Sequence, residues 1–183
     1  LKAIFLIIFP ELKYFKRLEK LLLFTKRKNI SQEVESIFAS LLVDDSDNFE
    51  YFCHKYKVSN KLKDSLFYIS KHYTEFKNDK NFLKTNFKKK IYYIEKKNIK
   101  KLLMYIFSVE KKFDQSTLIK KIKEIDTFQV PKFPLNGQFL IKQGLKDGKK
   151  IGLTLKKLED EWVKNNFSLD EKIINSIVNK SKS

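Results

Sequence analysis

The chain has few of the residues that stiffen or cross-link a protein, and it has no long apolar run. Its 183 residues include 4 glycines, 3 prolines and a single cysteine, Cys53. One cysteine permits no internal disulfide, so we expect a reducing compartment, the cytoplasm. The opening segment LKAIFLIIF is too short to span a bilayer and has no small-residue cleavage site, so we expect no membrane partner. We expect this segment to be part of a buried helix.

Apolar residues recur at helical spacing through nearly the whole chain. Hydrophobic residues make up 42% of it, which argues against disorder. Few segments alternate as strands do. The pattern therefore predicts an all-α protein, an elongated array of short helices followed by a compact C-terminal helical unit. The expected helices cover approximately residues 12–28, 31–41, 48–57, 62–76, 99–106, 118–125, 136–143, 149–165 and 168–178.

Two prolines mark the best domain boundary. The residue before each proline is pushed out of the helical region, so the stretch from Val130 to Pro134 must be extended. We therefore expect one helical region over 1–130 and a tail unit over 131–183. Ser31 is expected to cap an early helix, and Ser168 with Glu171 has the spacing of a capping box that opens the last one.

The net charge of +17 favours a polyanionic partner, of which nucleic acid is the usual one. Only Arg17 and Arg27 among the 39 basic residues are arginine, and lysine suits sequence-independent contact with phosphates. Between Lys77 and Lys123 there are 15 lysines and 4 acidic residues, an excess of 11. As a whole this cluster favours a surface that faces RNA. Background composition and solvated helix faces remain the alternative.

Three of the four glycines lie close together, at Gly144, Gly148 and Gly152. Gly144 suits the left-handed position that ends a helix, and Gly148 opens the next one. Gly152 lies in the first turns, where glycine costs about 1 kcal/mol relative to alanine, so we expect something to approach closely there. Free amides together with Lys149 and Lys150 would make a phosphate-binding corner. A tight helix–helix contact is an equally good interpretation of the spacing.

Catalytic patterns are weak. Asp45-Ser46-Asp47 has the carboxylate spacing of a magnesium site, but no Gly-Ser turn precedes it and no strand surrounds it, so a polar loop is expected. Cys53 and His54 diverge by about 100° on a helix and cannot easily share a metal, so Cys53 is expected in the core. No catalytic or metal-binding residue is therefore predicted in this chain.

The segment from Phe133 to Phe167 contains an ordered set of residues that resembles a known family. It is similar to the C-terminal signature of class II tRNA nucleotidyltransferases, the CCA-adding enzymes and their poly(A) polymerase relatives, above all in the alphaproteobacterial and mitochondrial branch. This chain has Phe139 where the family often has Asp, and Asp147 and Lys149 where the family has prolines. The matching residues are Phe133-Pro134-Leu135-Asn136-Gly137, Gly144-Leu145, Gly148, Ile151-Gly152, Leu155, Leu158, Glu159, Trp162 and Phe167.

The resemblance implies that the chain is the helical body and tail of an enzyme that adds CCA to tRNA, with its catalytic head upstream of Leu1. The body and tail would bind the acceptor stem and elbow of tRNA. No cofactor is expected in this chain, because Mg²⁺, CTP and ATP would bind the head, and the chain alone should be inactive. The resemblance assigns RNA contacts to Lys142, Lys146, Gly148, Lys149, Lys150 and Gly152, the turn to Gly144, and support of the second helix to Trp162, Leu155 and Leu158.

Three alternatives remain. The chain could belong to a poly(A) polymerase of the same family, because the choice of product lies with the head. A stand-alone basic helical protein would bind RNA or DNA without preferring tRNA. A helical interaction module with background lysines would function almost independently of salt.

Overall fold

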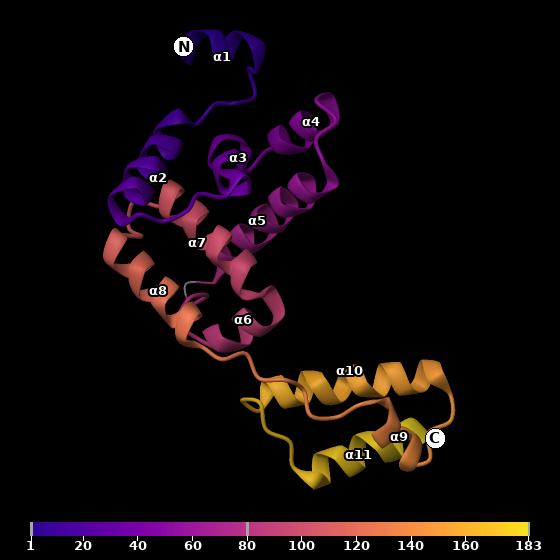
Figure 1. The fold of residues 1–183 in the computed structure, drawn as a ribbon. Helices are drawn as coiled ribbons and strands as arrows, with labels where there is room; N and C mark the ends of the chain where they lie inside the picture. The colour runs from indigo at the N-terminus through magenta and orange to yellow at the C-terminus, as the bar shows by residue number, and fades with distance from the viewer. Residues whose placement is uncertain (1, 80, 183) are drawn as a thin grey trace. The chain divides into compact units, whose positions relative to one another are not determined.

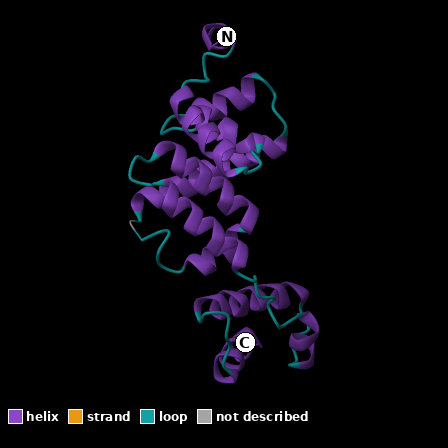
Figure 2. Ribbon diagram, turned by 60° about the vertical axis from the view of Figure 1, so that its left-hand side comes forward, coloured by secondary structure: helices purple, strands orange, loops and turns teal. Residues whose placement is uncertain are grey.

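The structure is a computed structural model that describes residues 2–79 and 81–182. These residues form helices, turns and loops but no strand (Figures 1 and 2), which confirms the all-α prediction. The chain divides into two compact units between Phe128 and Gln129. We call the part up to Phe128 unit 1 and the part from Gln129 unit 2.

Unit 1 is organised around one helix, α7 (Lys96–Val109). The others are α1 (Lys2–Ile8), α2 (Phe15–Lys28), α3 (Val34–Leu42), α4 (Asn48–Lys55), α5 (Asn60–Asn78), α6 (Phe87–Ile94) and α8 (Gln115–Thr127). Helices α2, α3, α5, α6 and α8 all pack against α7. Since Leu102, Leu103 and Ile106 are fully buried, α7 is apolar on nearly every side, as the central helix of a bundle must be.

The first helix departs from the prediction. Ile4, Ile7 and Ile8 expose 60%, 81% and 56% of their surface, so the prediction of a buried helix was wrong. The segment is apolar, but no neighbouring element of the described chain covers those side chains. Among the described residues, no helix combines the length and apolar character needed to cross a membrane.

Two helix starts also differ from the prediction. Helix α3 has Glu33 and not Ser31 at its N-cap position, and the Glu33 side chain makes no capping hydrogen bond. Helix α11 (Glu171–Lys182) begins after Asp170, whose Oδ1 accepts a hydrogen bond from the Lys172 amide at 2.7 Å. Aspartate is as good a cap as serine, and Asp170 lies next to the first helical residue. Ser168 is therefore not the cap.

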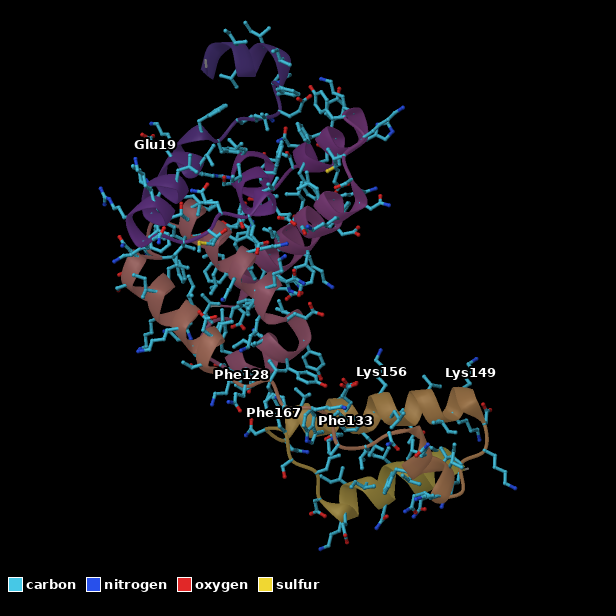
Figure 3. All side chains as sticks on the ribbon, in the orientation of Figure 1. Glu19, Phe128, Phe133, Lys149, Lys156 and Phe167 are labelled. Atoms are coloured by element: carbon cyan, nitrogen blue, oxygen red, sulfur yellow. The ribbon has the colours of Figure 1, made fainter. Side chains whose placement is uncertain are left out.

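Unit 2 contains α9 (Gly137–Lys142), α10 (Gly148–Lys164) and α11. Residues 128–136, which include both prolines of the expected boundary, are not helical, as expected. Trp162 is buried, and its ring packs edge-on against Phe133 and Phe167, with 5.4 and 5.1 Å between centroids. These ring contacts lie at the C-terminal end of α10. Figure 3 labels Phe133 and Phe167. The core of the unit consists of Leu140, Leu145, Leu158 and Val178, with Leu155 packed against it.

Candidate nucleic-acid interface

The turn between α9 and α10 has the geometry predicted from its first glycine. Gly144 adopts φ +94°, which L-residues rarely adopt. Its amide donates to the Ile141 carbonyl at 2.9 Å, and the Leu145 amide donates to the Leu140 carbonyl at 3.1 Å. These two bonds are those of a Schellman motif, and Leu145 and Leu140 add the apolar contact that accompanies it. The turn is therefore fixed by Gly144 and by the core below it.

The first backbone amides of α10 are capped by a side chain of the protein itself. Asp147 is the N-cap, and its Oδ1 accepts hydrogen bonds from the amides of Lys149 at 2.7 Å and Lys150 at 3.4 Å. The expectation of free amides at these two residues was therefore wrong. Aspartate is among the best N-caps, and its carboxylate occupies the place that a bound phosphate would take. Any phosphate contact here must come mainly from lysine side chains.

The next two glycines are exposed and have room around them. A Cβ built on Gly148 or on Gly152 would meet no atom of the described chain within 4 Å, and neither residue has a positive φ. The tight helix–helix contact is therefore not present, and the close approach expected at Gly152 does not come from the described chain. Because alanine would fit at both positions, the fold does not require glycine there.

The four lysines of the turn, Lys142, Lys146, Lys149 and Lys150, are exposed. Within the described part of the chain, none of them lies within 4.0 Å of a carboxylate oxygen. Figure 3 shows Lys149 and Lys156 projecting from the same side of α10. Positive charge without a nearby carboxylate partner therefore lies at the turn and at the start of α10.

The order of charges along α10 runs against the helix dipole. From Lys132 to Lys157 there are seven lysines and one acidic residue, Asp147, an excess of 6. The second half of the helix carries Glu159, Asp160 and Glu161 instead. Cations are stabilising near the C-terminus of a helix and anions near its N-terminus, each by about 0.3–1 kcal/mol. Apart from the Asp147 cap, this arrangement does not favour helix stability.

The lysine-rich segment of unit 1 is partly neutralised by the fold. Lys101 is buried and lies 3.2 Å from Glu35 and 3.4 Å from Glu33. A lysine that is paired with a carboxylate is less available to a polyanion than the sequence indicated, because a phosphate must break or share the ion pair. Among the described residues between 77 and 123, the lysines that form ion pairs with carboxylates include Lys77, Lys90, Lys97, Lys100, Lys101 and Lys121.

The weak catalytic patterns are structural. The Asp44 Oδ1 accepts hydrogen bonds from the Ser46 amide at 2.9 Å and the Ser46 hydroxyl at 2.6 Å, and Asp45 pairs with Lys77. This is the polar loop that was expected. Cys53 lies in the core, and burial raises the pKa of its thiol. In the described residues, no three His, Cys, Asp or Glu side chains are grouped so that they could hold a metal ion.

No protein-family model matches the chain. A segment of 60 residues is 32% identical to the mitochondrial CCA tRNA nucleotidyltransferase 1 of Mus musculus and 30% identical to that of Homo sapiens. The match covers 33% of this chain and 14% of each of these relatives. Part of this chain is similar to a tRNA nucleotidyltransferase. The similarity supports, over that segment, the family link that the C-terminal motif indicated.

Proposed function

We propose that this chain is the C-terminal tRNA-binding part of a CCA-adding tRNA nucleotidyltransferase. Its helices would bind the acceptor stem and elbow of tRNA in the cytoplasm. The catalytic head, with its Mg²⁺, CTP and ATP, would lie outside this chain. The observation that carries the proposal is the similarity to two CCA-adding enzymes, taken together with the family's glycine turn at Gly144.

The first half of α10 supports an RNA contact because its composition does not favour stability. Gly152 costs about 1 kcal/mol of helix stability and relieves no strain or crowding. Lys149 and Lys150 stand at the positive end of the helix dipole. A phosphate backbone would offset both, since it attracts the lysines and approaches most closely where a side chain is missing.

The mode of binding follows from Asp147. Because its carboxylate already accepts from the amides of Lys149 and Lys150, the turn offers point charges and little backbone donation. Lysine ammonium groups contact phosphates without reading bases. Recognition would therefore depend on the shape and phosphate spacing of an A-form stem.

The test is a charge reversal with a matched control. Lys149 is the second residue of α10, behind the Asp147 cap, and Lys172 is the second residue of α11, behind the Asp170 cap. Lys172 lines a groove with the acidic second half of α10, away from the turn. Lys149→Glu and Lys172→Glu therefore change the net charge equally and at the same position of a capped helix. Glutamate suits this position of a helix, so both variants should fold.

Affinity is measured for a tRNA lacking its CCA end and for an RNA hairpin of equal length, across a salt series. Lys149→Glu is expected to weaken tRNA binding and to reduce the salt slope by about 1 per lost phosphate contact, whereas Lys172→Glu changes little. Equal effects of the two variants would remove the glycine turn from the interface. Equal binding of tRNA and hairpin would favour a stand-alone basic RNA-binding protein. A poly(A) polymerase would bind in the same way, since its head determines the product.

A further inference from the structure

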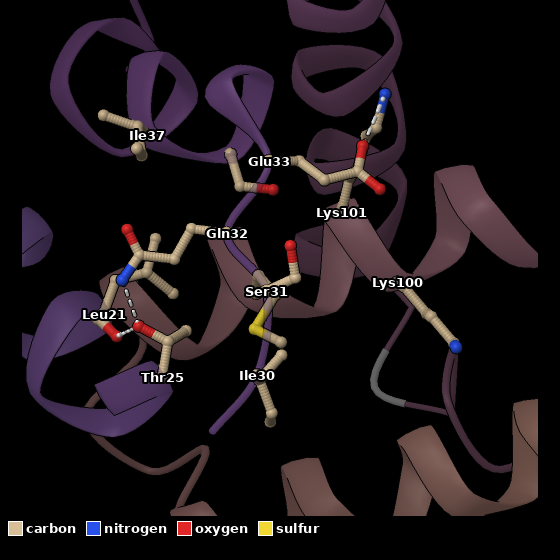
Figure 4. A pocket seen from close by; sticks show the side chains of 11 residues that line it. Leu21, Thr25, Ile30, Ser31, Gln32, Glu33, Ile37, Lys100 and Lys101 are labelled. Atoms are coloured by element: carbon tan, nitrogen blue, oxygen red, sulfur yellow. Dashed lines mark hydrogen bonds and ion pairs between the residues drawn. The ribbon is translucent and has the colours of Figure 1, made fainter. Parts of the chain in front are cut away.

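Unit 1 contains a cavity of about 250 Å³ between α2, α3 and α7 (Figure 4). Its rim includes the exposed residues Ser31 and Gln32, and its walls include the apolar side chains of Leu21, Ile30 and Met104. Pockets for drug-sized ligands measure about 300–1,000 Å³. The cavity is therefore suited to a single ring system.

The hydrogen bonds of Thr25 determine how Gln32 faces the cavity. The Thr25 hydroxyl donates to the Leu21 carbonyl at 3.0 Å, or to the Leu22 carbonyl at 3.1 Å, so its proton is already used. Its oxygen must then accept, and it accepts from the Gln32 Nε2. The Gln32 Oε1 is consequently turned away from Thr25 (Figure 4) and has no donor among the described residues. Gln32 lines the cavity, so its Oε1 can accept a hydrogen bond from a ligand there.

The hydroxyl groups of the cavity add adaptable partners. The side chains of Ser31 and Ser36 both line it, and neither has a hydrogen-bond partner in the described part of the chain. Each hydroxyl can donate or accept. Together with Gln32 they provide three polar contacts beside apolar walls, the usual composition of a site for a small, orienting ligand.

The charges around the cavity are balanced. Lys101, which lines it, is paired with Glu33 at 3.4 Å (Figure 4) and with Glu35 at 3.2 Å, and Lys100 is paired with Asp126. An anionic ligand would have to compete with these carboxylates for the ammonium groups. The cavity therefore favours an uncharged ligand over a phosphate.

We propose that this cavity binds a nucleobase that carries an exocyclic amino group. The amino group would donate to the Gln32 Oε1, and the ring would pack on the Met104 thioether and on Ile30. The source would be an unpaired base of bound RNA, and in this respect the inference rests on the proposed function. Proteins recognise single-stranded RNA by taking unstacked bases into such sites.

The test uses Met104, the only methionine of the sequence, as a reporter. The full chain, labelled with ¹³C at the methionine methyl, is titrated by NMR with cytidine, adenosine, uridine and inorganic phosphate. Cytidine and adenosine should shift the methyl signal upfield through their ring currents, with a Kd on the order of 1 mM. Uridine, which lacks the amino group, should bind more weakly, and phosphate should have no effect. An unmoved methyl, or uridine equal to cytidine, would overturn the proposal.

Free nucleosides make this result independent of tRNA binding, so the two proposals can fail separately. Ser31→Phe places a ring at the exposed rim and should abolish the shift, while Ser168→Phe, at an exposed loop residue of unit 2, should retain it. Unchanged thermal unfolding shows that both variants fold. A single-stranded oligonucleotide should shift the methyl signal and a blunt RNA duplex should not. A duplex as effective as the single strand would overturn the assignment to an unpaired base.

Discussion

Replacing Gly152 with alanine is expected to stabilise unit 2 and to weaken RNA binding at the same time. Apart from its chain neighbours and the backbone of its own helix, the new Cβ meets no atom of the described residues within 4 Å, and the backbone at Gly152 has no positive φ, so the substitution introduces neither crowding nor strain. Alanine therefore gains the full difference in helix propensity, about 1 kcal/mol. The same methyl group would stand between the helix backbone and a phosphate.

Gly144→Ala is the matched substitution, and it is expected to lower the stability of unit 2. A Cβ there would also have room, because its nearest neighbour is the Lys182 Cε at 3.8 Å. The backbone is the obstacle, since φ is +94°. Holding alanine in a left-handed conformation costs about 1–2 kcal/mol. The same change from glycine to alanine should therefore raise stability at Gly152 and lower it at Gly144.

Thermal unfolding of the full chain, followed by circular dichroism, measures the first effect. Unit 2 has 55 residues, and for a domain near this size 1 kcal/mol corresponds to about 4–8 °C in Tm. Fluorescence anisotropy with a tRNA lacking CCA measures the second effect. A Gly152→Ala variant that is no more stable would refute the argument from helix propensity. A more stable variant with unchanged affinity would show that Gly152 does not face RNA.

Two further outcomes test the packing and the buried charges. Leu158→Ala removes a fully buried side chain from the core of unit 2 and should cost about 2–5 kcal/mol, so that hydrogen exchange rises throughout unit 2 while α7 stays protected. Burial alone would raise the pKa of Glu35, but hydrogen bonds from its own amide and from Lys101 lower it overall. A lowered carboxyl pKa contributes stability that is present above the unfolded value, 4.5, and is lost as pH falls through the folded value. Tm should therefore fall below about pH 4.5, and a Glu35→Gln variant should lose less Tm there than the parent.

The sequence predicted helices best where the apolar period was long. Helix α5 covers the predicted range 62–76, and Leu66, Ile69 and Tyr73 are its buried residues. Helix α6 was missed, although Phe87, Ile91 and Ile94 have the right spacing. It is short and rich in lysine, and it lies between Asn86 and Glu95, which both adopt positive φ without being glycine. Sharp turns at non-glycine residues leave little signal in a sequence.

The candidate site was predictable only in part for a similar reason. The left-handed conformation of Gly144 follows from local sterics, and the sequence located it correctly. The spacing of the glycines does not show which side chain accepts hydrogen bonds from the first amides of α10, and in the structure that side chain is Asp147. The cavity brings Gln32 beside Met104, 72 positions further along the chain, so only the packing of α2 and α3 on α7 creates it. Tertiary contacts of this kind have no local signature.

The place where a polyanion binds depends on lysines that have no carboxylate partner, and not on the total charge of each unit. The excess of lysine in unit 1 is larger, yet several of its ammonium groups lie beside carboxylates that would have to be displaced or repelled. The ammonium groups of Lys149 and Lys150 have no such partner within the described residues, although the Asp147 carboxylate at the helix start offsets part of the positive potential of the α10 dipole. A phosphate backbone can therefore contact these lysines without displacing a carboxylate from their ammonium groups, and the missing side chain of Gly152 leaves room for its approach. Two features that reduce the stability of α10 thus favour the same ligand at the same surface.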